Sequence, residues 1–252
     1  MNKKDKIEVI ILAAGKSTRM KSEIPKALST LKGKPFLQHI LDTLKKIDPK
    51  IKPIIVVGHK KELIKEALGD GHIYAEQHEQ LGTGHAVWSA KNAIKSPHKI
   101  VLVLATDQPL VSKETLERII EKHTEKNPTI TLATVTIPDF ENWRIGLKHF
   151  GRIIRGVDGL VKKIVEFKDA NNEEKENKEL NPALYAFDAK WLWENIDKIK
   201  NENVQAEYYL TDLIKMACDQ NKKIEMVPVF NIVEALQPNS KEELEILEKL
   251  VL

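Results

Sequence analysis

Apolar and polar positions follow two different periods along the first half of the chain. Short, nearly continuous apolar runs are typical of buried strands, and longer segments with apolar residues every three to four positions are typical of helices. The runs predict strands at Ile7–Ile11, Pro53–Val57, Ile73–Ala75, Ile100–Ala105 and Thr129–Ile137. The longer segments predict helices at Pro35–Lys46, Lys60–Leu68, Gly84–Ile94 and Ser112–His123, the last with Ser112 as N-cap and Glu114 in its first turn.

This alternation predicts an α/β fold with a mainly parallel sheet, in part mixed, and helices on both faces. In such folds ligands bind beyond the carboxyl ends of the strands. Residues that directly follow Ile11, Ala75 and Ala105 are therefore expected at the ligand-binding edge.

The second half of the chain has a less regular pattern. It predicts strands or hairpin arms at Arg152–Ile154, Val161–Glu166 and Leu180–Phe187, and a further strand at Ile224–Val229. It predicts helices at Ala189–Ile199 and Glu207–Asp219, and a closing helix at Lys241–Leu250. The charged run Asn171–Glu179 is expected to be a solvated loop. Because no repeat or Pro/Gly/Ser linker occurs, we expect one domain over 1–252, with parts at 1–138, 139–230 and 231–252.

Composition narrows the function classes. The chain is 42% hydrophobic and 31% charged, and 40 basic against 37 acidic residues give a net charge of only +3, so nothing indicates a nucleic acid or membrane partner. The single cysteine, Cys218, excludes an intrachain disulfide and a cysteine-rich zinc site. No apolar run could span a bilayer, and the polar start does not resemble a secretory signal. We expect a cytoplasmic enzyme or binding protein.

The loop after the first strand has the chemistry of an anion site. Ala13, Ala14 and Gly15 let a ligand approach the backbone, and successive N–H groups in such a loop can form an anion-binding concavity. Three cations follow: Lys16, Arg19 and Lys26. The loop is neither a Walker A loop nor a dinucleotide-binding G-x-G-x-x-G, and an ordinary strand-to-helix turn is the alternative.

Two more segments carry candidate chemistry. Gln77–Ala86 contains two glutamines, which offer the donors and acceptors needed to read a nucleobase edge, but it could also be a glycine-rich helix entry. Asp107 ends an apolar strand, where a carboxylate is a natural Mg²⁺ ligand, although it could instead cap the following turn.

Taken together, these motifs resemble the sugar-1-phosphate nucleotidylyltransferases, and above all the uridylyltransferase domain of the bifunctional uridylyltransferase/acetyltransferases. The resemblance covers nearly the whole chain in order. It is carried by Leu12–Met20 with Pro25-Lys26, Gln77–Ala86, Asp107–Leu110, Gly151–Ile153, Val165–Ala170, Glu179–Asn181, Ala206–Asp212 and Glu234–Asn239.

The resemblance implies a Rossmann-like nucleotide-diphospho-sugar transferase fold with a small, irregular, β-rich sugar-binding lobe. It implies nucleotide contacts from Leu12, Ala13, Ala14, Gly15, Gln77, Gln80, Gly82 and Thr83. It places sugar contacts at Thr106, Gly151, Glu166, Asn181 and Thr211. Catalytic roles fall to Arg19, Lys26 and Asp107, and Mg²⁺ binding to Asp107 and Asn239.

The implied reaction is uridylyl transfer from UTP to N-acetylglucosamine 1-phosphate. The family's acetyltransferase domain is not expected, and without it we expect a monomer or weak homodimer. Departures from the family surround the expected sugar pocket and the metal: Thr106 and Ala206 replace glycines, Pro182-Ala183 replaces Thr-Gly, and Gln237-Pro238 replaces Gly-Val. Three alternatives remain: another sugar 1-phosphate or dTTP, a cytidylyl- or molybdopterin-type nucleotidyltransferase, and a non-catalytic nucleotide-sugar sensor.

Overall fold

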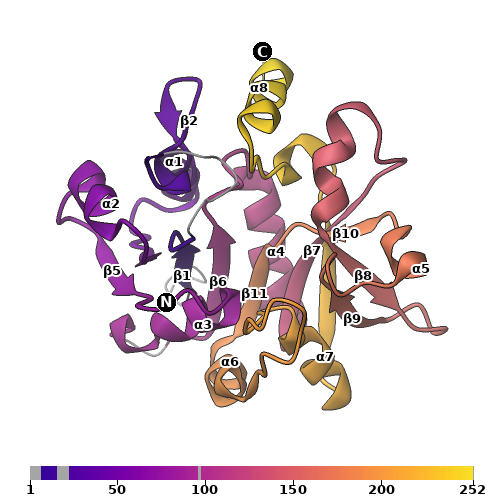
Figure 1. The fold of residues 1–252 in the computed structure, drawn as a ribbon. Helices are drawn as coiled ribbons and strands as arrows, with labels where there is room; N and C mark the ends of the chain where they lie inside the picture. Colours follow the sequence, from indigo (N-terminus) through magenta and orange to yellow (C-terminus); the bar gives the residue numbers. More distant parts are fainter. Residues whose placement is uncertain (1–6, 16–22, 96–97, 252) are drawn as a thin grey trace.

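The computed structural model describes residues 7–15, 23–95 and 98–251. The described residues form a ten-stranded sheet in the order β5-β4-β1-β6-β11-β7-β10-β8-β9, with β12 paired to β7 (Figure 1). Its strands are β1 (Ile7–Leu12), β4 (Ile54–Val57), β5 (Ile73–Glu76), β6 (Ile100–Ala105), β7 (Ile130–Thr136), β8 (Gly151–Arg155), β9 (Val161–Val165), β10 (Glu179–Asn181), β11 (Tyr185–Asp188) and β12 (Ile224–Pro228). A small hairpin, β2 (Thr30–Leu31) and β3 (Lys34–Pro35), lies apart from this sheet.

The sheet is mixed and mainly parallel, as the alternating pattern predicts. β5, β4, β1 and β6 run parallel, and β7 and β12 share their direction, whereas β11, between β6 and β7, runs antiparallel to both. β8, β9 and β10 add antiparallel pairs at the far end, where the smaller lobe lies beside the main sheet (Figure 1). The register pairs Leu12 with both Val56 and Ala105, so β1, β4 and β6 end together at one edge.

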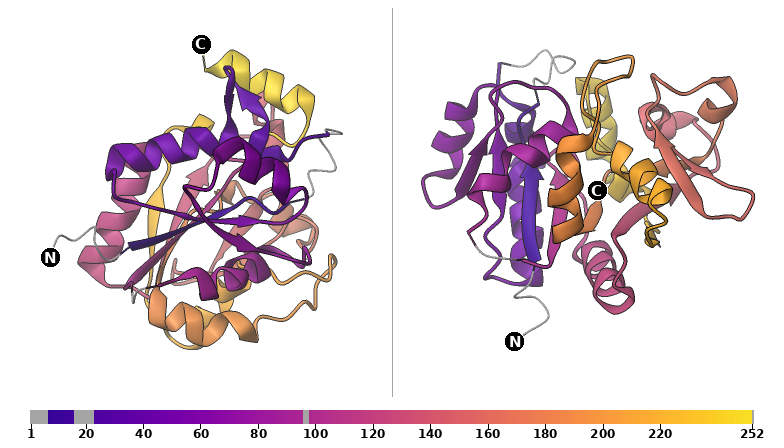
Figure 2. Two further views of the ribbon diagram at one scale, coloured as in Figure 1. Left: turned by 90° about the vertical axis from the view of Figure 1, so that its left-hand side faces the viewer. Right: turned by 90° about the horizontal axis from the view of Figure 1, so that it is seen from below.

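Helices cover both faces because side chains of a strand alternate between them. On β1, Val9 and Ile11 face one core and Ile10 faces the other. The first core takes apolar residues from α1 (Phe36–Ile47), α2 (Lys61–Leu68), α4 (Lys113–Lys126) and α8 (Lys241–Leu250). The second takes them from α3 (Thr83–Ser89), α6 (Ala189–Asn195) and α7 (Asp212–Asp219), and Figure 2 shows the two layers. No helix built by the described residues is both long and apolar enough to cross a bilayer.

Helix termini follow local capping chemistry. Ser112 caps α4 by accepting a hydrogen bond from the Thr115 N–H, and Glu114 lies in the first turn, both as predicted. The helix continues to Lys126 and ends where Asn127 adopts a left-handed conformation. The predicted helix Gly84–Ile94 is shorter than expected: α3 ends at Ser89 and a separate 3₁₀ turn follows at Lys91–Ala93.

The prediction of one strand over Leu180–Phe187 is wrong. β10 and β11 are separate strands, because Pro182 lacks an N–H and Ala183 has a φ of +58°. β10 pairs with β7 and β8, whereas β11 pairs with β6 and β7. This break bends the chain beside Asn181.

Two further expectations need correction. The run Asn171–Glu179 is not wholly a solvated loop, because Asn171 and Glu174 form a capping box on the short helix α5 (Asn172–Lys175) and β10 begins at Glu179. The predicted helix Glu207–Asp219 begins only at Asp212. The residues before it are not helical, and two of them, Tyr208 and Leu210, bond to another loop, described below.

A fully buried arginine holds the smaller lobe together. The Arg152 guanidinium donates hydrogen bonds to the carbonyl oxygens of Lys148, Phe150 and Lys175, and its charge lies over the rings of Phe140 and Phe167. A buried guanidinium costs free energy unless its donors are satisfied, and here backbone carbonyls and aromatic faces satisfy them. Arg152 therefore joins the turn before β8 to the end of α5.

A buried histidine should make the stability of the fold depend on pH. His123 on α4 is 4% exposed, and its Nδ1 lies 3.0 Å from the Thr131 hydroxyl. Burial lowers the pKa of His123 to about 4. This value lies below the pKa of a histidine in the unfolded chain, about 6.5. The contribution of neutral His123 to the free energy of unfolding is therefore complete above pH 6.5 and is lost as the pH falls through 4.

We predict that wild-type protein loses about 2 kcal/mol more unfolding free energy than His123→Gln between pH 7.5 and pH 5. Glutamine keeps a polar group near Thr131 but does not titrate. Urea unfolding of both proteins at the two pH values measures the difference. Equal losses in the two proteins would show that His123 does not titrate on unfolding.

Candidate active site

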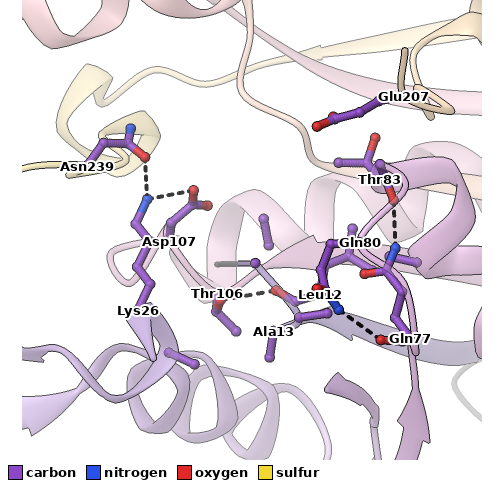
Figure 3. Close-up of a pocket in the computed structure, with 16 residues that line it drawn as sticks. Leu12, Ala13, Lys26, Gln77, Gln80, Thr83, Thr106, Asp107, Glu207 and Asn239 are labelled. Atoms are coloured by element: carbon purple, nitrogen blue, oxygen red, sulfur yellow. Dashed lines mark hydrogen bonds and ion pairs between the residues drawn. The ribbon is translucent and has the colours of Figure 1, made fainter. Parts of the chain in front are cut away.

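A cavity of about 500 Å³ opens at the edge where β1 and β6 end (Figure 3). Its lining comes from the two strand ends, the glutamine-rich loop and helix α3, the turn that holds Lys26, and two later segments: Leu12, Ala13, Ala14, Gly15, Lys26, Ala27, Gln77, Gln80, Gly82, Thr83, Ala86, Ala105, Thr106, Asp107, Glu207 and Asn239. All eight predicted nucleotide contacts thus surround one space. Arg19 lies outside the described residues.

The floor of the cavity is fixed by Thr106. Both its N–H and its hydroxyl donate to the Leu12 carbonyl, at 3.1 and 3.0 Å, and the Ala13 N–H donates to Val56 at 2.8 Å. Thr106, which stands where the family usually has glycine, therefore uses its side-chain hydroxyl to bind the backbone at the end of β1. Thr106, expected among the sugar contacts, stands on the floor and joins the ends of β6 and β1.

One end of the cavity carries an ionic cluster. The Lys26 ammonium donates to Asp107 Oδ2 at 2.9 Å and to Asn239 Oδ1 at 2.7 Å, so it lies between the two residues predicted to bind the metal (Figure 3). The lysine side chain is 12% exposed and that of Asp107 is 25% exposed. The cluster is thus shielded from bulk water, which strengthens each electrostatic contact.

The amide of Asn239 is oriented by its neighbours. Its Nδ2 donates to the Gln237 carbonyl at 2.7 Å, which leaves Oδ1 facing Lys26. Its backbone N–H donates to Glu243 at 2.6 Å, next to the Ser240 cap of α8. Gln237 in turn donates to the carbonyl of Pro182 at 3.1 Å, so this loop also touches the break between β10 and β11.

The residues at this end fit a magnesium ion. Asp107 Oδ1 is buried and has no hydrogen-bond partner among the residues that the structure describes, and such an orphaned carboxylate oxygen is a ready cation ligand. Asn239 Oδ1 supplies a second hard oxygen, and the Lys26 ammonium links it to the same carboxylate. Mg²⁺ needs only one or two protein oxygens when phosphate and water complete its shell. No cluster of three or more His, Cys, Asp or Glu side chains that could hold a metal occurs within residues 7–15, 23–95 and 98–251.

The opposite end is lined by amides that also shape their own loop. Gln77 is 4% exposed, and its Nε2 donates to the Gly82 carbonyl at 3.0 Å and lies 3.1 Å from His85 Nδ1. Gln80 Nε2 donates to the Gln77 carbonyl at 3.0 Å. These bonds hold the polar groups of both side chains in place before any ligand arrives.

Residues 204–210 form a strap that packs against this loop. Gly84 N–H donates to Tyr208 O at 2.8 Å, Tyr208 N–H donates to Leu81 O at 2.7 Å, and Leu210 N–H donates to the Thr83 hydroxyl at 2.9 Å. These contacts are why the predicted helix does not begin at Glu207. They bring the Glu207 side chain into the cavity, which the sequence pattern did not predict (Figure 3).

The other predicted sugar contacts form a second group behind Glu207. Thr211 donates to Glu166 Oε1 at 3.0 Å, and a Cβ built on Gly151 would lie 3.4 Å from the same carboxylate. Asn181 Nδ2 contacts the Tyr185 hydroxyl at 2.6 Å. Burial, helped by the nearby Glu166 charge, raises the pKa of Tyr185, so this phenol stays a neutral hydrogen-bonding group. No sequence motif indicates a functional role for Tyr185.

This second group is acidic. Burial first, and then the charges of Asp169, Asp212 and Glu207, raise the pKa of Glu166, while the Thr211 hydroxyl lowers it. Carboxylates and an amide are suited to accept hydrogen bonds from the hydroxyl and amide N–H groups of a ligand. The arrangement therefore combines a cation-lined end for phosphates with an acceptor-rich region for a polyhydroxy group.

Known proteins share this architecture and these motifs. Residues 9–199 match the model of the MobA-like NTP transferase domain. The chain belongs to this family. It is a nucleotidyltransferase, and the resemblance seen in its motifs is confirmed at the level of the family.

Its curated relatives are longer proteins. The chain is 42% identical over 244 residues to the bifunctional protein GlmU of Clostridioides difficile, which covers 97% of this chain and 51% of that protein. It is 41% identical over 232 residues to the bifunctional protein GlmU of Exiguobacterium sibiricum, covering 92% and 50%. The chain thus spans about half the length of these relatives.

Solved structures show the same fold. A UDP-glucose pyrophosphorylase complexed with UDP-glucose matches with a TM-score of 0.75 at 16% identity, over 97% of both chains. A 4-diphosphocytidyl-2C-methyl-D-erythritol synthase from Anaerococcus prevotii matches with a TM-score of 0.64 at 17% identity, again over 97% of both. At these identities the likeness establishes the fold alone, and it confirms the predicted fold class.

The contact between the strap and Gly82 offers a direct test of the geometry. Gly82 has a φ of +111°, and a Cβ there would lie 2.6 Å from Tyr208 O and 2.8 Å from Tyr208 N. We predict that Gly82→Ala lowers the free energy of unfolding by about 2–4 kcal/mol, through backbone strain and displacement of the strap.

Gly71→Ala is the matched control, because its added methyl group meets nothing within 4 Å and Gly71 does not have a positive φ. Its stability should stay within about 1 kcal/mol of wild type. Urea unfolding of the three proteins makes the comparison. A Gly82→Ala protein as stable as Gly71→Ala would contradict the described packing.

Proposed function

We propose that this protein transfers a uridylyl group from UTP to N-acetylglucosamine 1-phosphate, giving UDP-N-acetylglucosamine and pyrophosphate. One observation carries the proposal: a single cavity holds the Lys26–Asp107–Asn239 cluster at one end and an amide-lined loop at the other. The identity of about 40% to GlmU proteins supports the choice of substrates. The described parts act as one nucleotidyltransferase domain.

In this proposal the nucleotide lies along the strand edge. Backbone groups of residues 12–15 hold the nucleotide, since the small side chains of Ala13, Ala14 and Gly15 allow close approach. Gln77, Gln80, Gly82 and Thr83 surround the uracil and ribose. The internal hydrogen bonds of the two glutamines reduce the ordering cost of binding, since their side chains are already placed.

The sugar phosphate occupies the acidic region. Glu166, Asn181 and Thr211 supply hydrogen-bonding groups for its hydroxyl and acetamido groups. Gly151 leaves room beside Glu166, since a side chain there would press against Ile164 and the carboxylate. Thr106 contributes to the pocket floor near the reacting phosphates.

The reaction is an in-line displacement. An oxygen of the sugar phosphate forms a bond to the α-phosphorus of UTP, and the bond from that phosphorus to the bridging oxygen breaks, so pyrophosphate leaves with the electron pair. Bound magnesium would supply charge neutralisation for the two phosphate groups. Lys26 offsets negative charge on the α-phosphate and sugar phosphate, and Arg19 stabilises the departing pyrophosphate. Asp107 and Asn239 would hold the metal ion, and so keep the two phosphate groups aligned for the displacement.

The substrate assignment is tested by pyrophosphate release with UTP, dTTP, CTP and GTP, each combined with N-acetylglucosamine 1-phosphate, glucosamine 1-phosphate and glucose 1-phosphate. We expect kcat/KM for UTP with N-acetylglucosamine 1-phosphate to exceed every other pair at least tenfold. A higher value for another pair would reassign the substrate, and no pyrophosphate from any pair would favour a sensor.

A second prediction concerns Asp107. Removing one preorganised charge at the reacting phosphates costs about 3–4 kcal/mol of barrier, on the order of a hundred- to thousandfold in rate. We therefore expect Asp107→Ala to lower kcat by that factor while circular dichroism stays unchanged. Asp70→Ala, at an exposed position outside the cavity, is the control and should keep wild-type kcat. Near wild-type turnover in Asp107→Ala would remove this residue from the mechanism.

A further inference from the structure

The cation end of the cavity contains a feature that the proposed reaction does not require. The Lys26 ammonium lies 2.9 Å from Asp107 Oδ2 and 2.7 Å from Asn239 Oδ1, between the two residues suited to hold a divalent ion (Figure 3). Phosphate binding alone would be served equally well by a lysine that pointed into open space. Here the charge is instead directed at the metal ligands.

The ammonium and a divalent cation cannot share this position. Asn239 Oδ1, one of the two candidate metal ligands, already accepts a hydrogen bond from the ammonium, and a Mg²⁺ ion bound to the same oxygen at 2.0–2.1 Å would lie beside that positive charge. The two cations also repel each other strongly in a site shielded from water. Lys26 must therefore leave one or both oxygens before the ion enters.

In the protein without ligands the lysine is the favoured occupant. Within the described part of the chain, one buried oxygen of Asp107 has no hydrogen-bond partner, so the Lys26 contact to its other oxygen offsets the cost of burying the charge. Asn239 is held by Gln237 and Glu243 with its oxygen toward the ammonium. The geometry of both ligands is thus maintained without a metal.

A polyphosphate supplies the force that moves the lysine. Lys26 lines the same cavity as the strand-edge loop, Leu12–Gly15, and its side chain is a flexible four-carbon stem that carries a mobile point charge. Phosphate oxygens in the cavity offer the ammonium a more negative partner than one carboxylate and one amide. The same phosphates would bring the divalent ion to the oxygens that the lysine leaves.

We propose that Lys26 occupies the metal position in the nucleotide-free protein and exchanges it for a divalent cation only when a polyphosphate binds. This inference rests on the proposed function, because it assigns the polyphosphate to this cavity. It makes metal and nucleotide binding mutually dependent: the nucleotide enters first or together with the ion. Lys26 is then a positioning residue for the metal ligands as well as a phosphate contact.

The test measures Mn²⁺ binding to nucleotide-free protein by electron paramagnetic resonance, in which free Mn²⁺ gives the signal. We expect wild-type protein to bind Mn²⁺ weakly, and Lys26→Met and Lys26→Ala to bind one ion with at least tenfold lower Kd. The Lys26→Met/Asp107→Asn double variant should lose that gain. Lys222→Met, at an exposed position away from the cavity, controls for removal of one positive charge and should match wild type.

Two outcomes overturn the proposal: wild-type protein that binds Mn²⁺ as tightly as the Lys26 variants, or Lys26 variants that both bind no more tightly than Lys222→Met. Circular dichroism verifies that each variant is folded, and having both Met and Ala excludes obstruction by one side chain. Because the measurement contains no nucleotide and no turnover, it is independent of the substrate panel. A failure of uridylyl transfer and a failure of the lysine exchange are therefore distinguishable.

Discussion

The contact of Lys26 with Asp107 and Asn239 is the interaction on which the candidate site depends. It joins segments that lie 81 and 213 residues apart in sequence: a turn after the first loop, the end of β6 and the loop before α8. A site that brings two phosphate groups together must supply positive charge where both arrive. The fold holds the Lys26 ammonium between a carboxylate and an amide oxygen at the edge of the sheet, where β1 and β6 end side by side.

The strap over residues 204–210 is the second constraint on the cavity. Its backbone bonds to Leu81, Thr83 and Gly84 fix the wall opposite the lysine cluster, and only a glycine at position 82 leaves space for Tyr208. The same strap carries Glu207 into the cavity and leads directly to Thr211 in the acidic group. One short segment thereby connects the amide-lined end of the cavity to the region behind it.

The sequence predicts the central fold well because the decisive interactions there are local or periodic. Apolar runs mark β1 and β6, and Ser112 caps α4 through a bond three residues away. The order of the motifs predicts the family, but the convergence of Lys26 and Asn239 follows from the resemblance and not from any pattern in the chain. Segments such as Asn171–Glu179 and Glu207–Thr211 were misassigned because side-chain capping and tertiary backbone bonds override their charge and helical spacing. The role of the Thr106 hydroxyl depends on a carbonyl 94 residues away, which no local pattern reveals.

The hydrogen bond from Gln237 to the Pro182 carbonyl has a consequence for enzyme engineering. Under the proposed function, Pro182 and Ala183 are positions to exchange when a different acceptor is wanted, since they adjoin Asn181 and depart from the family pattern. Yet the Pro182 carbonyl accepts a hydrogen bond from the Gln237 side chain, and the Gln237 carbonyl accepts one from the Asn239 side-chain amide. Libraries that randomise positions 182–183 should therefore also vary position 237, because a change at 182–183 can shift Gln237 and with it the Asn239 side chain.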